Sequence, residues 1–377
     1  MKLAILGTRG VPPRYGGFET FAAELSRRLV ARGHRVAVYC RERDGEWDGV
    51  HRIVLPAIRH KYLETVSHTF LSALDALRRG FDAVLLCNAA NAFVLPLLRA
   101  ARIPAAINVD GIERRRRKWN ALGRAVYAAG ETLAATFADR VVADAEVIAA
   151  YYREVHRIEP VMIPYGAEFP DEPDSDVLQK LQIEPGQFFL YVSRFEPENN
   201  PLEVVEAYEK LTVGGWQLAD AAANRQLPTA NLPPLVMLGS AAYAHDLDAA
   251  LRRHAGPRVI LAGAIYGRDY RTLQRNALLY IHATEVGGTH PAMIEAMASG
   301  GCVVALDTPE NREVGGDAVR YFELGPNQTL SGTLSECVAA PALRDQMRAA
   351  ARARAGALYS WDRVTDTYER LFFELAS

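Results

Sequence analysis

Residues 285–301 read EVGGTHPAMIEAMASGG, and this stretch decides the fold. A short apolar run at 278–282 precedes it and a second run at 302–306 follows it, and each run predicts a buried strand. Between them a Gly-rich turn leads through Pro291 into strong helix formers, which end at two glycines. Pro is tolerated in a first helical turn, where no N–H is needed. The stretch therefore predicts strand, turn, helix and strand.

The same turn could bind an anion. A Gly-rich turn at a helix N-terminus directs several N–H groups and a positive dipole to one point. Glu295 lies about one turn inside the predicted helix, where its carboxylate would repel phosphate but could accept hydrogen bonds from sugar hydroxyls. Taken alone, the pattern is more typical of an ordinary βαβ connection with a surface Glu.

The N-terminal segment repeats this order. The expected elements are a strand at 2–7, a loop at 9–17 (RGVPPRYGG), a helix at 18–32 and a strand at 35–40. Together they predict a Rossmann-type half. Gly16 and Gly17 could let the backbone approach a pyrophosphate, although a tight turn would use two glycines equally well.

The alternation continues to the middle of the chain. Further strands are expected at 50–56, 83–87, 105–109 and 140–143, with helices at 64–78, 91–101, 123–137 and 145–152, and the segment 161–167 is the last element of this half. Asp110 follows the strand at 105–109, and ligands of open α/β sheets bind outside the carboxyl ends of strands. Asp110 is thus a candidate for contact with substrate, and an Asx turn at Asp110–Gly111 is an equal alternative.

Five consecutive cations, Arg114, Arg115, Arg116, Arg117 and Lys118, come before Trp119. Such a run is usually a solvated helix face, and helical spacing would spread it around the axis. Two other interpretations remain, an acceptor phosphate and an anionic lipid surface.

Composition changes at 169–175, FPDEPDS, which predicts a linker. The second half then restarts with strands at 188–192, 235–239 and 259–262, and helices at 202–211, 268–276, 344–357 and 363–376. The segment 214–234 is polar and predicts a loop or insertion without an assigned role. Arg194 follows the first of these strands, and a guanidinium can clamp phosphate, although a solvated loop residue is the alternative.

Bulk properties limit the function classes. The 377 residues suit two domains, and a net charge of −2 gives no reason to expect nucleic acid. The four scattered cysteines predict buried free thiols in a reducing compartment. No signal peptide and no apolar run of membrane-spanning length occur, so a cytoplasmic protein is expected. The sequence shows no DxD-type carboxylate pair in a metal-holding loop, so no metal site is expected.

Three motifs resemble those of one family, the retaining GT-B glycosyltransferases of family 4. Its donor signature is a Glu, seven residues, a second Glu and Ala-Met-Ala-x-Gly; residues 295–300 match the second half, while Gly287 stands in the place of the first Glu. PPRYGGFET at 12–20 resembles the N-terminal loop of these enzymes. Arg194 matches their phosphate-binding Arg, and Asn199 replaces their Lys. The Gly-Gly-Thr-x-Pro and Glu-Asn-Asn forms resemble a subgroup that includes rhamnosyltransferases of bacterial surface polysaccharide synthesis.

The resemblance covers nearly the whole chain and implies a GT-B fold, an α/β architecture of two Rossmann-like, doubly wound domains that face a central cleft. The implied divisions are an acceptor domain at 1–168, a linker at 169–185, a nucleotide-sugar domain at 186–356, and a C-terminal helix at 357–377 that packs back on the first domain.

The resemblance also implies roles for individual residues. They are Asp110 and Arg194 in catalysis; Gly16, Gly17, Arg194 and Asn199 at the donor diphosphate; Gly263, Ile265 and Glu295 at the nucleotide; Gly287, Gly288, Thr289 and His290 at the donor sugar; and Arg114, Arg115, Arg116, Arg117 and Lys118 at the acceptor or membrane.

The implied activity is transfer of a hexose from a nucleoside diphosphate sugar to a glycan or lipid diphosphate-linked acceptor, with retention and without a metal or other cofactor. Rhamnose is the first expectation for the sugar and UDP-hexoses the next. The protein would be cytoplasmic or peripheral at the inner face of the membrane, without a nucleic-acid partner. The alternatives are a nucleotide-sugar epimerase or phosphorylase, and a non-catalytic subunit that binds the nucleotide sugar.

Overall fold

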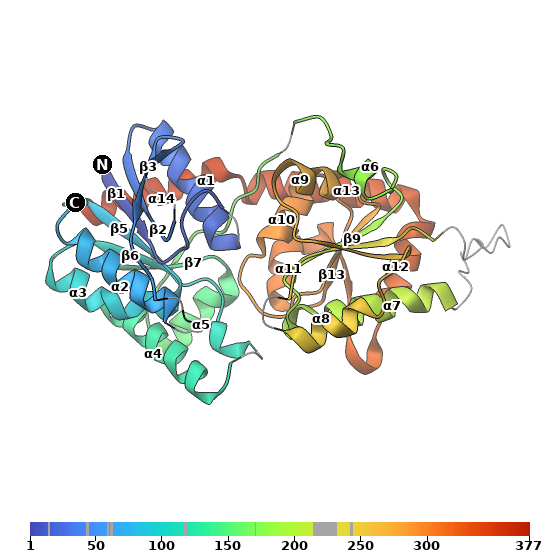
Figure 1. Ribbon diagram of the computed structural model, residues 1–377, viewed down its shortest axis with the longest axis horizontal. Coiled ribbons are helices and arrows are strands. Elements are labelled where there is room, and N and C mark those ends of the chain that lie inside the picture. Colours follow the sequence, from blue (N-terminus) through green and yellow to red (C-terminus); the bar gives the residue numbers. More distant parts are fainter. Residues whose placement is uncertain are drawn as a thin grey trace. The chain divides into compact units, whose positions relative to one another are not determined.

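The computed structural model describes residues 1–13, 16–42, 45–58, 60, 63–116, 119–169, 171–213, 232–241 and 244–377. These residues form two compact units (Figure 1). The first comprises Met1–Gly166, Gly287–Thr289 and Ser360–Ser377, and the second comprises Ala167–Val286 and His290–Tyr359. Each unit contains one sheet.

The sheet of the first unit has the order β3-β4-β2-β1-β5-β6-β7-β8. Its strands are β1 Lys2–Leu6, β2 Arg35–Cys40, β3 Gly45–Trp47, β4 Val50–Val54, β5 Ala83–Cys87, β6 Ala105–Asn108, β7 Arg140–Ala143 and β8 Val161–Met162. All neighbouring pairs are parallel except β3 and β4. Strands buried on both faces are rich in Val, Ile and Leu, as a parallel sheet requires.

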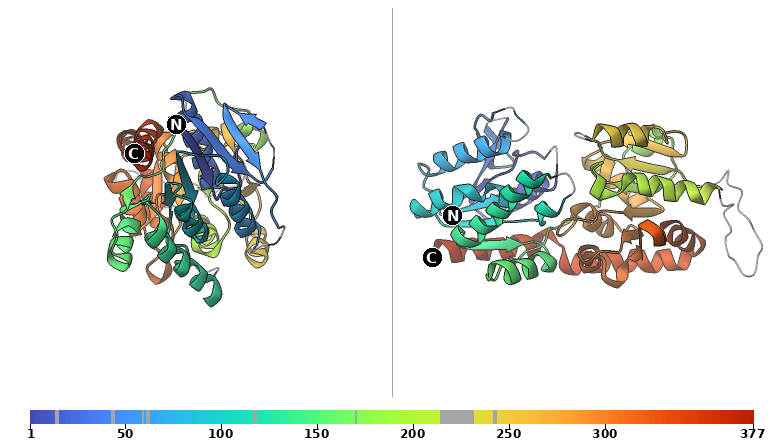
Figure 2. Two further views of the ribbon diagram at one scale, coloured as in Figure 1. Left: turned by 90° about the vertical axis from the view of Figure 1, so that its left-hand side faces the viewer. Right: turned by 90° about the horizontal axis from the view of Figure 1, so that it is seen from below.

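Helices cover both faces of this sheet (Figures 1 and 2). The described helices are α1 Gly17–Ala31, α2 Glu64–Ala76, η1 Ala89–Val94, α3 Leu95–Ala100, η2 Glu113–Arg115, α4 Ala121–Phe137, α5 Glu146–His156 and α14 Trp361–Ala376. Helices α1 and α14 contact each other on one face, while α2, η1, α3, α4 and α5 form a continuous layer on the other. A core of 27 buried residues fills the space beneath this layer.

The sheet of the second unit is parallel throughout, with the order β11-β10-β9-β12-β13-β14. Its strands are β9 Phe189–Val192, β10 Leu235–Leu238, β11 Val259–Gly263, β12 Leu279–His282, β13 Val303–Leu306 and β14 Arg320–Phe322. Its described helices are α6 Val177–Lys180, η3 Pro197–Asn199, α7 Pro201–Val213, α8 His245–Arg252, α9 Gly267–Asn276, α10 Pro291–Ala298, α11 Pro309–Gly315, η5 Gly316–Ala318, η6 Gly325–Asn327, α12 Leu330–Ala339 and α13 Pro341–Leu358. Figure 1 shows α7, α8 and α12 on one face and α9, α10 and α13 on the other.

The structure confirms two Rossmann-like domains and adds elements that periodicity missed. The strands β3 and β14 and the helices α8 and α12 were not predicted, because they are short or lack a clear apolar period. The predicted helix at 91–101 is two pieces, η1 and α3. Most of the predicted insertion, 214–231, lies outside the described residues.

The segment 171–185 of the predicted linker is part of the second unit. Glu172 pairs with Arg271 at 2.6 Å, and Asp174 pairs with Arg275. The Arg268 guanidinium donates to the carbonyl oxygens of Pro173 and Asp174, each at 3.0 Å. Three arginines of α9 therefore hold this segment against the helix.

Candidate active site

Each sheet has a point where the strand order reverses. In the first unit this point lies between β1 and β5, and in the second it lies between β9 and β12. Loops at the carboxyl ends of such strands diverge and leave a crevice, which is where open α/β sheets bind ligands. In the second unit the two loops that flank the crevice follow Val192 and His282.

Asn200 joins these two loops. Its backbone is left-handed at φ 54°, and its side-chain amide donates to the Ala283 carbonyl at 2.9 Å and to Oε1 of Glu285 at 3.1 Å. The N–H of Glu285 donates to the Glu198 carbonyl at 2.9 Å. Because Asn200 and Glu198 are buried, these bonds fix the Arg194 loop relative to the loop after β12.

Arg194 is the exposed cation of this loop, with 44% of its side chain accessible and its guanidinium 3.6 Å from the Glu196 carboxylate. Asn199 lies five residues further along the same loop. Its side-chain amide is buried and donates to the Arg194 carbonyl at 2.7 Å, while its own carbonyl accepts the Tyr191 hydroxyl at 2.6 Å. Asn199 therefore holds the loop in shape, and Arg194 is the side chain that the loop presents.

At Gly239 the backbone passes close to the backbone of Ser193, at the start of the same loop. A Cβ at this position would overlap with the Ser193 carbonyl oxygen, and φ is +154°, so only glycine fits without strain. The Gly239 N–H donates to the Gly263 carbonyl at 2.9 Å. The predicted nucleotide-binding segment, Gly263 to Ile265, is thereby attached to the backbone beside Arg194.

Glu295, the predicted ribose ligand, has a defined orientation. Its Oε2 accepts the Tyr270 hydroxyl at 2.8 Å. The Gln274 amide donates to the same Tyr270 oxygen at 2.7 Å and to the Ala292 carbonyl at 3.2 Å. Helix α9 thus supports the first turns of α10, a relationship that no motif in the sequence indicated.

His290 occupies the N-cap position of α10 without a capping bond from its side chain, and Pro291 occupies the first helical turn, as predicted. The His282 ring lies with its centroid 4.7 Å from that of His290. Burial lowers the pKa of His282 to about 3, so this ring is neutral at physiological pH.

The predicted sugar-binding residues Gly287, Gly288 and Thr289 group with the first unit. The Thr289 N–H donates to Oδ2 of Asp144 at 2.8 Å, and its hydroxyl donates to the Asp144 carbonyl. A Cβ at Gly288 would overlap with the Asp144 carboxylate, so the glycine is required by space. Asp144 was not predicted, since nothing distinguishes it in the sequence from a loop residue after β7.

The loop after β1 is held by Glu19 and Asn91. Oε1 of Glu19 accepts the Arg9 N–H at 3.0 Å, and the Asn91 amide donates to the Gly7 carbonyl at 3.3 Å. Gly16 is the N-cap of α1 in an extended conformation, and Gly17 begins the helix. Arg14 and Tyr15 of the predicted phosphate loop lie outside the described residues.

Asp110 follows β6 with a left-handed φ of 52°. Its N–H donates to Oδ1 of Asn108 at 3.0 Å, so the Asn108 side chain forms a turn that leads into Asp110. The Asn108 amide also donates to the Tyr368 hydroxyl of α14 at 2.8 Å. The C-terminal helix therefore contacts the segment that places Asp110.

The basic run is not one exposed helix face. The Arg114 guanidinium donates to the Tyr151 hydroxyl at 2.6 Å and lies 3.2 Å from Glu131. Arg116 is buried and pairs with Glu113 at 2.6 Å. Its burial removes it from any lipid or acceptor surface. Arg115 ends the short helix η2, and Arg117 and Lys118 lie outside the described residues.

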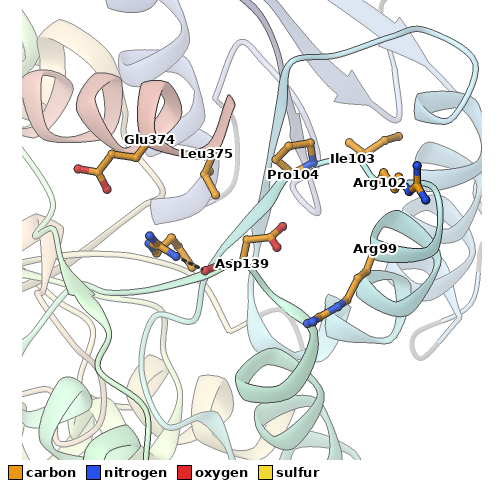
Figure 3. A pocket seen from close by; sticks show the side chains of 8 residues that line it. Arg99, Arg102, Ile103, Pro104, Asp139, Glu374 and Leu375 are labelled. Carbon is orange, nitrogen blue, oxygen red and sulfur yellow. Dashed lines mark hydrogen bonds between the residues drawn. The ribbon is translucent and has the colours of Figure 1, made fainter. Parts of the chain in front are cut away.

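A separate pocket of about 310 Å³ opens in the first unit at the amino ends of β6 and β7 (Figure 3). It is lined by Arg99, Arg102, Ile103, Pro104, Asp139, Arg140, Glu374 and Leu375. Arg99 donates to the Thr136 carbonyl at 3.1 Å, as a cation near a helix C-terminus does. No predicted site residue lies in this pocket.

All four cysteines are buried and free. Within the described ranges, no group of three or more His, Cys, Asp and Glu side chains is arranged to hold a metal ion. None of the helices described is both long and apolar enough to cross a membrane.

Comparisons with known proteins agree with this geometry. The profile of the family described as Glycosyltransferase Family 4 matches residues 15–168, and that of Glycosyl transferases group 1 matches residues 175–354. No curated protein matches the sequence.

Several solved structures are similar over nearly the full length of the chain. Sucrose-phosphate synthase from Thermosynechococcus elongatus has a TM-score of 0.81 and 17% identity, with 99% of this chain and 98% of that chain covered. Anabaena HepE in complex with UDP-glucose has a TM-score of 0.75 and 16% identity, with 98% and 99% covered. WaaG, a glycosyltransferase involved in lipopolysaccharide biosynthesis, has a TM-score of 0.69 and 17% identity, with 97% and 99% covered.

The two profiles together match most of the chain, and the folds agree over both units. The chain therefore belongs to the glycosyltransferases of the GT-B fold, with a Glycosyltransferase Family 4 domain followed by a Glycosyl transferases group 1 domain.

Proposed function

We propose that the protein transfers a hexose from a nucleoside diphosphate sugar to a glycan or lipid diphosphate-linked acceptor, with retention at the anomeric carbon and without a metal ion. The observation that carries the proposal is the loop pair at the switch point of the second unit. Asn200 binds the Arg194 loop to the loop after β12, and Arg194 remains exposed there. The similar HepE structures hold UDP or UDP-glucose, which supports a nucleotide-sugar donor.

Arg194 would stabilise the negative charge that develops on the leaving diphosphate. The N-terminus of α10, which begins after His290, would add a positive dipole, so that no metal is needed for this role. Glu295 would accept hydrogen bonds from the ribose hydroxyls, and Gly263 and Ile265 would contact the base through the backbone. Asp110 would lie near the acceptor hydroxyl.

The donor sugar is proposed from the subgroup resemblance of the Gly-Gly-Thr-x-Pro and Glu-Asn-Asn forms. This resemblance favours dTDP-rhamnose as the donor, with UDP-hexoses next. A role in polysaccharide synthesis is in keeping with the likeness to WaaG.

A thermal-shift screen of the full chain against dTDP-rhamnose, UDP-glucose, UDP-galactose, UDP-GlcNAc and GDP-mannose tests the donor site. A ligand at 100 times its dissociation constant adds about 2.7 kcal/mol of stability. The responding donor is then incubated with lipid diphosphate-linked glycans, and the products are analysed by mass spectrometry.

Each outcome is decisive. One responding donor and a product heavier by one hexose support the transferase. Interconversion of donors without an acceptor, or release of free sugar or sugar phosphate, indicates the epimerase or phosphorylase alternative. Donor binding without turnover across all acceptors indicates a binding subunit, and no response to any nucleotide removes the donor-site assignment.

A further inference from the structure

His282 is buried at the carboxyl end of β12 without a hydrogen bond. Its side chain is 3% exposed, and neither Nδ1 nor Nε2 has a hydrogen-bond partner among the described residues. Another buried histidine, His68, shows the ordinary arrangement, since its Nε2 bonds the Cys40 carbonyl at 3.0 Å. A buried polar atom without a partner destabilises the fold, because its hydrogen bond to water is lost and not replaced. His282 therefore lowers the stability of the second unit.

The His282 side chain lies on the face of the second sheet that carries α9 and α10. Leu279, Ile281 and Ala283 belong to the hydrophobic core together with residues of α7 and α8. Successive side chains of a strand point to opposite faces, so Tyr280 and His282 lie on the other face, where Figure 1 shows α9 and α10. The Tyr280 ring is nearly parallel to the His282 ring, with centroids 6.4 Å apart. Of the two, only His282 lies at the end of the strand, beside the switch-point crevice.

The His290 ring lies next to that of His282. The ring centroids are 4.7 Å apart, and the ring planes meet at 52°. His290 occupies the N-cap position of α10, and both residues belong to the second unit. His290 is the outer of the two rings, because 9% of its surface remains accessible. At this separation, rotation of one ring brings a nitrogen of each within reach of an N–H···N hydrogen bond.

A neutral imidazole is suited to hold a second imidazole. Burial lowers the pKa of His282 to about 3, so at neutral pH its ring has one N–H donor and one acceptor nitrogen. A bond from either nitrogen of His282 would fix the orientation of the His290 ring and the nitrogen of His290 that bears the proton. It would thereby decide whether His290 presents a donor or an acceptor to a ligand.

We propose that His282 is a positioning residue for the donor sugar. When the nucleotide sugar binds, His282 forms a hydrogen bond to His290 and fixes the ring orientation in which His290 contacts a sugar hydroxyl. Hydrogen bonds of active sites are often completed only in the ligand-bound state. A buried side chain that lowers stability in the free protein is typical of a functional site. This role rests on the proposed function, because the donor sugar is the ligand of His290.

The test is His282→Leu in the full-length protein, a substitution that removes both nitrogens and keeps a similar volume. Its melting temperature should rise by about 2–4 °C, because the unpaired buried atoms are gone. In isothermal titration, the dissociation constant of the nucleotide sugar that responds in the five-donor screen should rise about fivefold to tenfold, as for one lost hydrogen bond. That of the corresponding free nucleoside diphosphate should stay within about twofold. His282→Gln keeps an amide donor and acceptor and should restore sugar affinity to within about threefold of the wild type.

Tyr280→Phe is the matched control. The Tyr280 hydroxyl is buried and, in the described part of the chain, also has no hydrogen-bond partner. Its removal should likewise raise the melting temperature, but it should leave both dissociation constants unchanged.

The outcomes separate the role of His282 from the proposed function. Unchanged sugar affinity in His282→Leu, with donor binding by the wild type intact, overturns the role of His282 alone. A lower melting temperature in His282→Leu, or an equal loss of affinity for the nucleotide sugar and the free nucleotide, also overturns it, because either result indicates a distorted site. A wild type that binds none of the five donors rejects the proposed function and the role of His282 with it.

Discussion

The Tyr270 hydroxyl donates a hydrogen bond of 2.8 Å to Oε2 of Glu295, and the Gln274 amide donates to the same hydroxyl at 2.7 Å. The three side chains connect α9 to α10 within the second unit. Since Glu295 is the proposed ribose ligand, Tyr270 acts through it as a positioning residue. Gln274 holds the Tyr270 hydroxyl in place, and that hydroxyl holds Oε2 of Glu295. The direction of Oε1 is set thereby.

Tyr270→Phe should raise the dissociation constant for the nucleoside diphosphate of the responding donor about fivefold to tenfold, which corresponds to one lost hydrogen bond to a charged group, while kcat changes less than twofold. Isothermal titration with the free nucleotide and steady-state kinetics measure the two quantities. In a double-mutant cycle with Glu295→Gln, the two effects should not add, because both substitutions act on one contact.

Tyr208→Phe provides the control for this prediction. The Tyr208 hydroxyl is buried and donates to the Pro233 carbonyl at 3.0 Å, in the core on the other face of the same sheet. It should leave nucleotide affinity unchanged. Additive effects of Tyr270→Phe and Glu295→Gln, or an equal loss in Tyr208→Phe, would contradict the positioning role.

Arg194→Ala should lower kcat by a factor of ~10²–10³, because the exposed guanidinium of the β9 loop would no longer stabilise the leaving diphosphate. Single-turnover kinetics with the donor identified by the screen measure this effect. Arg252→Ala removes an exposed guanidinium from α8 and should stay within about twofold of the wild type, as expected for a surface ion pair. A loss of less than threefold in Arg194→Ala would reject the role of Arg194.

Gly239→Ala should destabilise the second unit by about 3 kcal/mol, because a methyl group would overlap with the Ser193 carbonyl at a φ of +154°. Displacement of Ser193 would also move Arg194, so donor affinity should fall with stability. Gly256→Ala is the control, since a Cβ there meets nothing within 4 Å. Urea unfolding of both variants tests the prediction, and equal stabilities would contradict the close crossing.

Glu369→Gln should lower the melting temperature of the first unit by about 1–3 °C at pH 7, and by progressively less toward pH 3 as the Glu369 carboxyl is protonated. The His34 ring, 2.7 Å from Glu369, and the Arg32 guanidinium, at 2.8 Å, hold the pKa of this carboxyl below its ordinary value. A lowered pKa contributes stability above the pKa of the unfolded chain, and this contribution is lost as the pH falls through the folded value.

Calorimetry of Glu369→Gln across this pH range provides the measurement. Glu374→Gln, on the same helix but without an ion pair among the described residues, should leave the melting temperature unchanged at every pH. A difference between Glu369→Gln and the wild type that does not shrink as the pH falls would show that packing, rather than charge, attaches α14 to α1.

The sequence by itself determined the strand and helix order, because an apolar run bounded by glycine or proline is a local signal. The spacing in EVGGTHPAMIEAMASGG places β12, α10 and β13 within one or two residues of the structure. It also indicated Arg194 and Glu295 as candidate site residues, because each belongs to a motif of a few consecutive residues. The same local reasoning left three interpretations of the cations at 114–118 open, and it could not indicate that Arg116 is buried against Glu113, because that contact depends on packing.

The tertiary structure alone decided which side chains hold the site and which way α2 faces. Asn199 turns its amide to the Arg194 carbonyl, and Tyr270 reaches Glu295 from a separate helix 25 residues away. The apolar side of α2 faces solvent because His68 and Thr69 find partners in Cys40 and Asn91. Periodicity shows that a helix has two sides, but the contacts between distant segments decide which side is buried.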